Sequence, residues 1–301
     1  MSIIITPLRA IIDFIYGLVG NYSVAIILFT LVIKLVLSPL DFKQRSSSRK
    51  MAALNDKIQE INKKYDKDPE KKNMKTMELY KKEGVNPLSG CLPMLIQLPI
   101  IFAMFAVLRH IADEQAVSMF LTAFNGGSFI PESFLWVHNI WQPDNIMAPI
   151  IPLLETVQVI RPIAGNPIVT EANLALMAAN YETVMKPLFD VYNTGTANGW
   201  AILPLAAGAS QFFMAKFTTP PPPQQQPKKA GAPDMSKMML YMMPLMSVFF
   251  CWQYNAAFAV YWATSSLYSI GLYYASNFFA KLKEGKSTSP ATLSDSEGKR
   301  K

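Results

Sequence analysis

Charged residues, cysteine and histidine are all scarce in this chain of 301 residues. Charged residues make up 16% of it and hydrophobic residues 51%, which favours a membrane protein over an ordinary soluble domain. Its two cysteines, Cys91 and Cys251, fall near opposite ends of predicted helices, so we expect no disulfide. Its two histidines, His110 and His138, lie at or beyond the edges of the apolar runs. These runs hold no paired acids, Ser/His set or metal-ligand set, so we expect neither an enzyme nor a cofactor.

Five apolar runs are long enough to cross a bilayer, or nearly so. They predict an all-α membrane protein with a five-transmembrane-helix core, and their bounds are 22–40, 91–111, 200–217, 238–252 and 256–276. The segment 1–20 carries an apolar face opposite Arg9 and Asp13, which predicts an amphipathic helix lying at the membrane surface. This segment lacks the basic start and the small-residue cleavage site of a signal peptide.

Basic residues are distributed unevenly between the loops. Segment 41–90 holds 13 lysines and arginines, whereas the longer segment 112–199 holds only Arg161 and Lys186. Because basic loops stay in the cytoplasm, we expect the N-terminus outside the cell and the C-terminus in the cytoplasm. Two further segments that carry lysines fit the cytoplasmic side, the Pro/Gln-rich loop 218–237 and the tail 277–301.

The two longest segments between apolar runs differ in pattern. In segment 41–90, apolar residues recur at three- and four-residue spacing with an interruption at 66–69, so we expect a cytoplasmic helical hairpin. The external segment 112–199 has weak periodicity, many prolines, and the tryptophans Trp136 and Trp141. It is compatible with a small capping subdomain and with a layer on the outer membrane surface.

Lys34 is the only charge in the first apolar run. A lysine at the centre of a membrane helix costs roughly 2.5–3.5 kcal/mol, so we expect its charge to be used. At 1.5 Å per residue, Lys34, Gln97 and Gln211 all lie about 9 Å from the cytoplasmic ends of their helices. The hydroxyls of Ser265 and Ser269 lie near the same height. These residues predict a polar cavity in the inner half of the membrane, against the alternatives that the lysine snorkels and the amides simply bond neighbouring helices.

Three stretches carry a resemblance to a known family: residues 20–40, residues 83–100 with the segment Asn-Pro-Leu-Ser-Gly-Cys-Leu-Pro at 86–93, and Val260-Tyr261-Trp262. They resemble the YidC/Oxa/Alb membrane-protein insertases, over roughly residues 1–112 and 199–283. The resemblance implies a groove that is open to the cytoplasm and to lipid but closed outside. Lys34 matches its charged position, Thr30 and Gln211 match groove positions, and Trp262, beside Tyr261 of the same motif, matches an aromatic position near it.

Members of this family usually have arginine where this chain has Lys34, so the charge is kept without the planar guanidinium fork. The resemblance implies a multi-pass insertase and chaperone of the bacterial cytoplasmic membrane, in a Gram-positive-like form without a large periplasmic domain. The implied partners are nascent membrane proteins and the lipid bilayer, with the Sec translocon and the ribosome as further candidates and no DNA. A small-anion channel or transporter is the alternative, but the sequence shows no inverted repeat and no second basic residue along a path to the outside.

Overall fold

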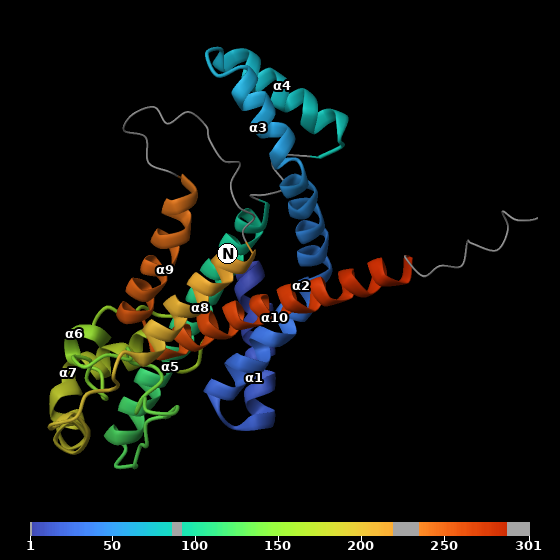
Figure 1. Cartoon of the computed structure of the whole chain (residues 1–301). Coiled ribbons are helices and arrows are strands. Elements are labelled where there is room, and N and C mark those ends of the chain that lie inside the picture. The colour runs from blue at the N-terminus through green and yellow to red at the C-terminus, as the bar shows by residue number, and fades with distance from the viewer. Residues whose placement is uncertain (1, 86–91, 219–234, 288–301) are drawn as a thin grey trace, which may run out of the picture.

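The computed structural model describes residues 2–85, 92–218 and 235–287, and the chain is built there from helices and loops (Figure 1). These residues contain no β-strand, only one isolated bridge between Phe134 and Val137. The all-α prediction is therefore confirmed for the described part of the chain. The helices are α1 (Ser2–Val19), α2 (Tyr22–Ala53), α3 (Asn55–Lys64), α4 (Pro69–Lys82), α5 (Leu92–Phe124), α6 (Leu154–Val157), α7 (Glu171–Leu188), the π-helix η2 (Phe189–Asn193), α8 (Ile202–Thr218), α9 (Met235–Gln253) and α10 (Ala256–Ser287).

Helix α2 extends beyond the predicted crossing 22–40 and continues without a break to Ala53. It begins after Asn21, whose side-chain oxygen accepts a backbone N–H of the first turn at 3.0 Å. Pro39 lies inside the helix and removes one backbone donor, but a long helix continues past such a gap where packing supplies the stability. Arg45 supplies such packing, since it donates a hydrogen bond to α10 at 3.0 Å.

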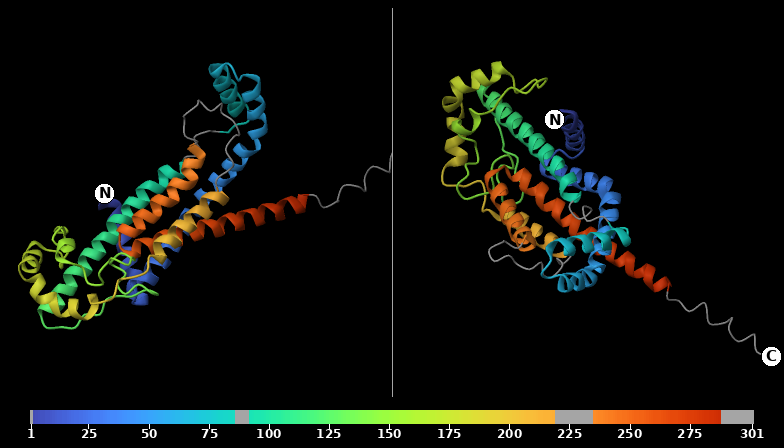
Figure 2. Two further views of the ribbon diagram at one scale, coloured as in Figure 1. Left: turned by 60° about the vertical axis from the view of Figure 1, so that its left-hand side comes forward. Right: turned by 90° about the horizontal axis from the view of Figure 1, so that it is seen from above.

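Beyond the end of α2, helices α3 and α4 form a hairpin that projects away from the bundle (Figure 1, and Figure 2, left). Helix α4 begins after Asp68, whose carboxylate accepts the N–H of Lys71 at 3.1 Å. The hairpin has a small core of its own, formed by Leu54, Ile58 and Val85 with Met51, Leu79 and Tyr80. The Asn86–Cys91 part of the family motif lies outside the described residues.

Helix α10 packs against α2 and α8, and α9 packs against α8 (Figure 2). Helices α8 and α9 approach closely at Gly208, where a Cβ would meet the side chain of Val248 and the carbonyl of Pro244. The main apolar core lies at the end of the bundle where α2, α8 and α10 begin. Its largest fully buried side chains are Ile12, Ile26, Phe29, Met104, Leu108, Ile111, Ile140 and Phe258.

Among the described residues, one helix, α2, is both long and apolar enough to cross a bilayer. The apolar stretches of α8 and α9, Ile202–Phe217 and Leu240–Gln253, are shorter. Large apolar side chains are nevertheless exposed on several helices, including Leu35, Val36, Leu205, Leu245, Phe249 and Leu267. A belt of this kind suits contact with lipid tails. The count of five crossings and the orientation of the chain stay predictions.

The region 112–199, which the sequence predicts to be external and which keeps the name external region below, begins inside α5, because this helix runs on to Phe124 past the predicted end of its crossing. Val117 and Phe120 explain the extension, since their side chains pack in a second apolar core together with residues of α6 and α7. In both figures the region lies at the end of the bundle opposite the hairpin. The region therefore has an apolar core of its own, and its placement relative to the membrane stays a prediction.

The C-terminal helices also differ from the predicted bounds. Helix α10 continues past the predicted crossing 256–276 to Ser287, so it takes up the first part of the predicted tail. Most of the predicted loop 218–237, and the rest of the tail from residue 288, lie outside the described residues.

Candidate functional site

Lys34 lies on α2 with only 9% of its surface exposed. Its Nζ donates a hydrogen bond to Oε1 of Gln97 on α5 at 3.2 Å. The Gln97 side chain is also within hydrogen-bonding reach of the Tyr261 hydroxyl on α10. Among the described residues, no carboxylate forms an ion pair with Lys34. The ammonium group therefore has three donors and a neutral amide as its hydrogen-bond partner.

A second polar contact joins α8 to α10. The Ser266 hydroxyl donates to Oε1 of Gln211 at 3.1 Å, and both side chains are buried. Gln211 and Ser265 are predicted groove residues, but Ser266, next to Ser265, is the hydroxyl that reaches the amide. No hydrogen bond among the described residues joins this pair to Lys34 and Gln97, so the structure gives two separate interhelical contacts.

The remaining predicted residues bond within their own helices or pack against aromatic rings. Thr30 donates to the carbonyl four residues earlier on α2 at 2.6 Å, and Ser269 donates to the Ser265 carbonyl at 3.0 Å. Both hydroxyls are thus occupied by local bonds. Trp262 packs edge-on against Phe258, with ring centroids 5.3 Å apart. Its indole Nε1 is buried and has no hydrogen-bond partner in the described part of the chain.

Arg45 and Arg49, which are not among the predicted site residues, lie on the same face of α2 as Lys34. Because α2 is continuous, the spacing from Lys34 to Arg45 and then to Arg49 is close to whole helical turns. Arg45 donates to the carbonyl of Ser269 at 3.0 Å, and Arg49 donates to the hydroxyl of Ser276 at 3.1 Å. The spacing of these arginines from Lys34 could have predicted their position, but the first crossing was expected to end at residue 40, before both of them.

The residues from Thr30 to Arg45 on α2, their partners on α5 and α10, and the Gln211–Ser266 contact between α8 and α10 are termed the polar half of the bundle. It is rich in donors: the ammonium of Lys34, Nη1 of Arg45 and Nε1 of Trp262. The last two are buried without a partner among the described residues. An unpaired buried donor costs about 1–3 kcal/mol, so this surface favours an occupant that brings acceptors such as carboxylates or carbonyls.

A loop of the external region closes the opposite end, termed the capped end, where α2, α8 and α10 begin. Helix starts carry free N–H groups and partial positive charge, so carboxylates stabilise them. The Glu132 carboxylate accepts the N–H of Tyr22 at the start of α2. The fully buried Asp144 accepts the N–H groups of Ala201 and Leu203 at the start of α8, at 3.0 and 2.7 Å.

The same loop caps α10 with two backbone carbonyls. The carbonyl of Gln142 accepts the N–H of Ala256 at 2.9 Å, and that of Ile140 accepts the N–H of Ala257 at 3.0 Å. Burial raises the pKa of Glu132, although the backbone N–H that it accepts opposes the shift. The capped end is therefore closed by hydrogen bonds as well as by the apolar core.

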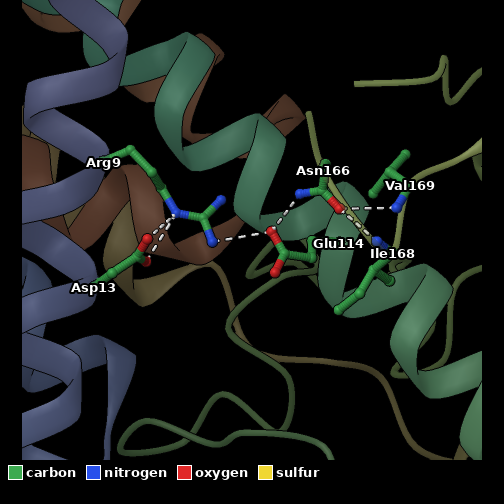
Figure 3. Close-up of polar contacts among 6 residues, drawn as sticks. All are labelled: Arg9, Asp13, Glu114, Asn166, Ile168 and Val169. Carbon is green, nitrogen blue, oxygen red and sulfur yellow. Dashed lines mark hydrogen bonds and ion pairs between the residues drawn. The ribbon is translucent and has the colours of Figure 1, made fainter. Parts of the chain in front are cut away.

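A polar network connects α1, α5 and the external region (Figure 3). Arg9 donates to Asp13 on its own helix at 2.8 Å and to Glu114 on α5 at 2.9 Å. Glu114 also accepts from the Asn166 side chain at 3.0 Å. Burial lowers the pKa of Arg9, but the two carboxylates outweigh it and raise that pKa above its ordinary value. The residues expected on the polar face of a surface helix thus hold α1 against α5.

Comparison with known proteins places this fold in a family. A family model described as "60Kd inner membrane protein" matches residues 14–282. The chain belongs to this family. The "Membrane protein insertase YidC" of Caldanaerobacter subterraneus subsp. tengcongensis is 35% identical over 71% of this chain and 88% of that protein. The protein of the same name from Leptospira interrogans is 31% identical over 89% of this chain, which spans 33% of that relative's length.

These matches confirm the resemblance to the YidC/Oxa/Alb family and place the chain among bacterial inner membrane proteins. Among solved structures, an active YidC insertase with its first transmembrane domain resolved aligns with a TM-score of 0.49 and 21% identity. The alignment covers 91% of this chain and 46% of that one. The family membership rests on the sequence matches.

Proposed function

We propose that this chain is a membrane protein insertase, which helps nascent membrane proteins enter the bilayer and fold there without covalent catalysis. Family membership and the shared name of its relatives support the proposal. The observation that carries it is Lys34, a buried cation whose partner is a neutral amide instead of a carboxylate. The Asp41 carboxylate on the same helix interacts with Lys34 electrostatically but forms no ion pair with it, so this buried charge still attracts an anionic group that comes near.

We assign the substrate groove to the polar half of the bundle and propose that it opens to the cytoplasm and to lipid. Its proposed lining is Thr30, Lys34, Gln97, Gln211, Tyr261, Trp262, Ser265 and Ser269, to which the structure adds Ser266 and Arg45. The Lys34 ammonium and Nη1 of Arg45, which is buried without an acceptor among the described residues, support this assignment because both groups are cationic. The hydrogen bonds of Glu132 and Asp144 support closure on the other side, because they bind the starts of α2 and α8 to the external region.

In this mechanism a polar tail or short loop of the substrate enters the groove from the cytoplasm. Acidic side chains of the tail pair with Lys34, which lowers the cost of a polar segment at that depth. Apolar parts of the substrate meet the exposed faces of α5 and α10. Their transfer into lipid gains about 0.3–0.6 kcal/mol for each leucine-like residue, and this gain draws the tail across without ATP hydrolysis by the chain.

The proposed topology has five crossings, the N-terminus outside and the C-terminus in the cytoplasm, as the distribution of basic residues indicates. The α3–α4 hairpin is then a cytoplasmic arm at the mouth of the groove, in a position to meet an arriving polypeptide. Nascent membrane proteins are the proposed partners, and the Sec translocon and the ribosome are candidates for delivering them.

The test is insertion of a small membrane protein with an acidic N-terminal tail into proteoliposomes that contain the purified full chain. Wild type is compared with Lys34→Arg, Lys34→Gln and Lys34→Glu. We expect Lys34→Arg to insert as well as wild type and Lys34→Glu to reduce insertion to the level of empty liposomes, because a negative charge repels the tail. Lys43→Glu is the matched control, since Lys43 lies on the same helix and is exposed.

Equal insertion by wild type and all three Lys34 variants would sink the proposed role of this charge. A substrate whose acidic tail is neutralised should lose its dependence on Lys34, which separates attraction of the tail from general stability of the groove. Chloride or phosphate currents through the same liposomes, without insertion, would instead support the small-anion channel.

A further inference from the structure

A pocket lies away from the polar half, between the outer part of α5 and the loop after α6. It has a volume of about 290 Å³, and its lining includes Arg109, His110 and Asp113 from α5 and Val159 and Arg161 from the loop. This is near the lower end of the range for ligand pockets, roughly 300–1,000 Å³. The space suits a compact polar group such as a lipid headgroup, not a whole lipid.

Basic groups outnumber acidic ones around the pocket. Arg109 and Asp113 form only a loose ion pair, with 3.8 Å between Nε and Oδ2. Arg161 donates from Nη1 to the carbonyls of Gln158 and Ile160, both at 3.3 Å, and among the described residues no carboxylate pairs with it. Two guanidinium groups therefore face a single carboxylate, and an anion gains from binding there.

The neighbouring network does not cancel this charge. Glu114, the next carboxylate along α5, is already bonded to Arg9 and Asn166 (Figure 3). Asp13 is bonded to Arg9 as well. Glu114 and Asp13 are thus both paired with Arg9, whereas Arg161 has no carboxylate partner among the described residues.

The pocket lies at the end of an apolar stripe on α5. Leu98, Phe102, Arg109 and Asp113 are spaced by four, seven and four residues, so they share one helical face. Phe102 is 57% exposed, and Leu98 is exposed as well. Arg109 lies about 10 Å further along the helix than Phe102. Since the predicted crossing ends at residue 111, this stripe runs through the membrane and reaches the pocket at headgroup depth.

We propose that the pocket binds the phosphate of an anionic phospholipid, with the guanidinium groups of Arg109 and Arg161 on the phosphate oxygens and an acyl chain along Phe102. Guanidinium groups form paired N–H bonds with phosphate, which a single ammonium does not. The apolar stripe favours a lipid over free phosphate as the source. This site rests on the predicted crossing by α5, and its two arginines lie outside the proposed substrate groove.

The test is lipid binding by the purified, delipidated full chain in nonionic detergent, read by native mass spectrometry. Phosphatidylglycerol, diacylglycerol and glycerol phosphate are added separately to wild type, Arg161→Gln and Phe102→Ser. Lys186→Gln is the matched control, because Lys186 is the other basic residue of the external region and is exposed. Size-exclusion profiles and melting temperatures establish that each variant is folded.

We expect wild type to retain phosphatidylglycerol and not diacylglycerol, and Arg161→Gln to weaken that binding about tenfold, since a hydrogen bond to a charged group is lost. Phe102→Ser should weaken binding of the lipid without changing that of glycerol phosphate, and Lys186→Gln should bind as wild type does. Equal losses in Arg161→Gln and Lys186→Gln would overturn the site in favour of general surface attraction. Binding of glycerol phosphate as tightly as the lipid would overturn the lipid as its ligand. Loss of insertion in any variant bears only on the proposed function.

Discussion

The capped end and the polar half are built from the same helices but differ in how their buried charged groups are bonded. At the capped end, the buried carboxylate of Asp144 accepts three hydrogen bonds, from two backbone N–H groups and from the indole of Trp136. In the polar half, Lys34 has a neutral partner, and the donors of Arg45 and Trp262 are buried without partners among the described residues. The Ser23 hydroxyl and the Trp141 indole of the capped end are also buried without partners among the described residues, so the two regions differ in their charged groups: the Asp144 carboxylate is bonded by three donors, whereas the Lys34 ammonium has no carboxylate partner.

This difference explains how one bundle can be stable and still bind a polar segment of a substrate. Hydrogen bonds from the external region and the large apolar core hold the helix starts in place. The resulting stability offsets the cost of an unneutralised cation farther along α2. Mutations at the capped end should therefore act on stability, and mutations in the polar half should act on insertion.

The largest effect is expected from Lys34→Leu, which replaces the buried charge of the polar half with an apolar side chain. Insertion of a substrate with an acidic tail should fall to background, because the attracting charge is gone. Stability should rise, since the desolvation cost of the lysine, roughly 2.5–3.5 kcal/mol, is removed. Insertion assays check the expected loss of insertion, and melting temperatures of the detergent-solubilised chain check the expected gain in stability. A stability loss would show that Lys34 serves the fold.

At the capped end, Asp144→Ala should give the opposite result. It leaves two backbone N–H groups at the start of α8 without their acceptor, at a cost of about 2–6 kcal/mol in the free energy of unfolding. Asp190→Ala is the control, because the ion pair of Asp190 with Lys186 is exposed and should contribute less than about 1 kcal/mol. Equal melting temperatures for the two variants would show that Asp144 does not stabilise the capped end.

Local patterns in the sequence predicted the helices and the depth of the polar residues, because hydropathy and helical rise are local properties. Lys34 and Gln97 were expected at one level, and the structure brings them into contact. The caps were not foreseen, since Asp144 reaches a helix start 57 residues away and no local pattern links them. Arg45 was missed because helix α2 was expected to end near Pro39, whereas packing against α10 carries it further.

A smaller effect is expected at the contact between Gln211 and Ser266 in the polar half. Ser266→Ala alone leaves the Gln211 amide without its partner and should cost about 1–3 kcal/mol. Gln211→Leu with Ser266→Ala removes both partners and should cost less than the single change. Melting temperatures of the single and double variants test this. If both variants insert normally, the contact belongs to helix packing and the groove is confined to the surroundings of Lys34.

The smallest effect is expected at the pocket beside the capped end, where pH should tune binding of an anionic lipid. Burial raises the pKa of Asp113 to about 6, against the opposing charge of Arg109. Above that pH the carboxylate is ionised and repels phosphate, so binding should strengthen as pH falls from 7 to 5, by about two- to fivefold for a partly exposed charge.

The other titratable group of this pocket is His110, which also gains positive charge as pH falls, while Arg109 and Arg161 stay charged throughout. Asp113→Asn separates the two, because it removes the carboxylate and leaves the imidazole. We expect this variant to bind the lipid more tightly than wild type at pH 7 and about equally at pH 5, in the same native mass spectrometry measurement. If Asp113→Asn keeps the full pH dependence of wild-type lipid binding, that dependence comes from His110 and the Asp113 carboxylate does not face the phosphate.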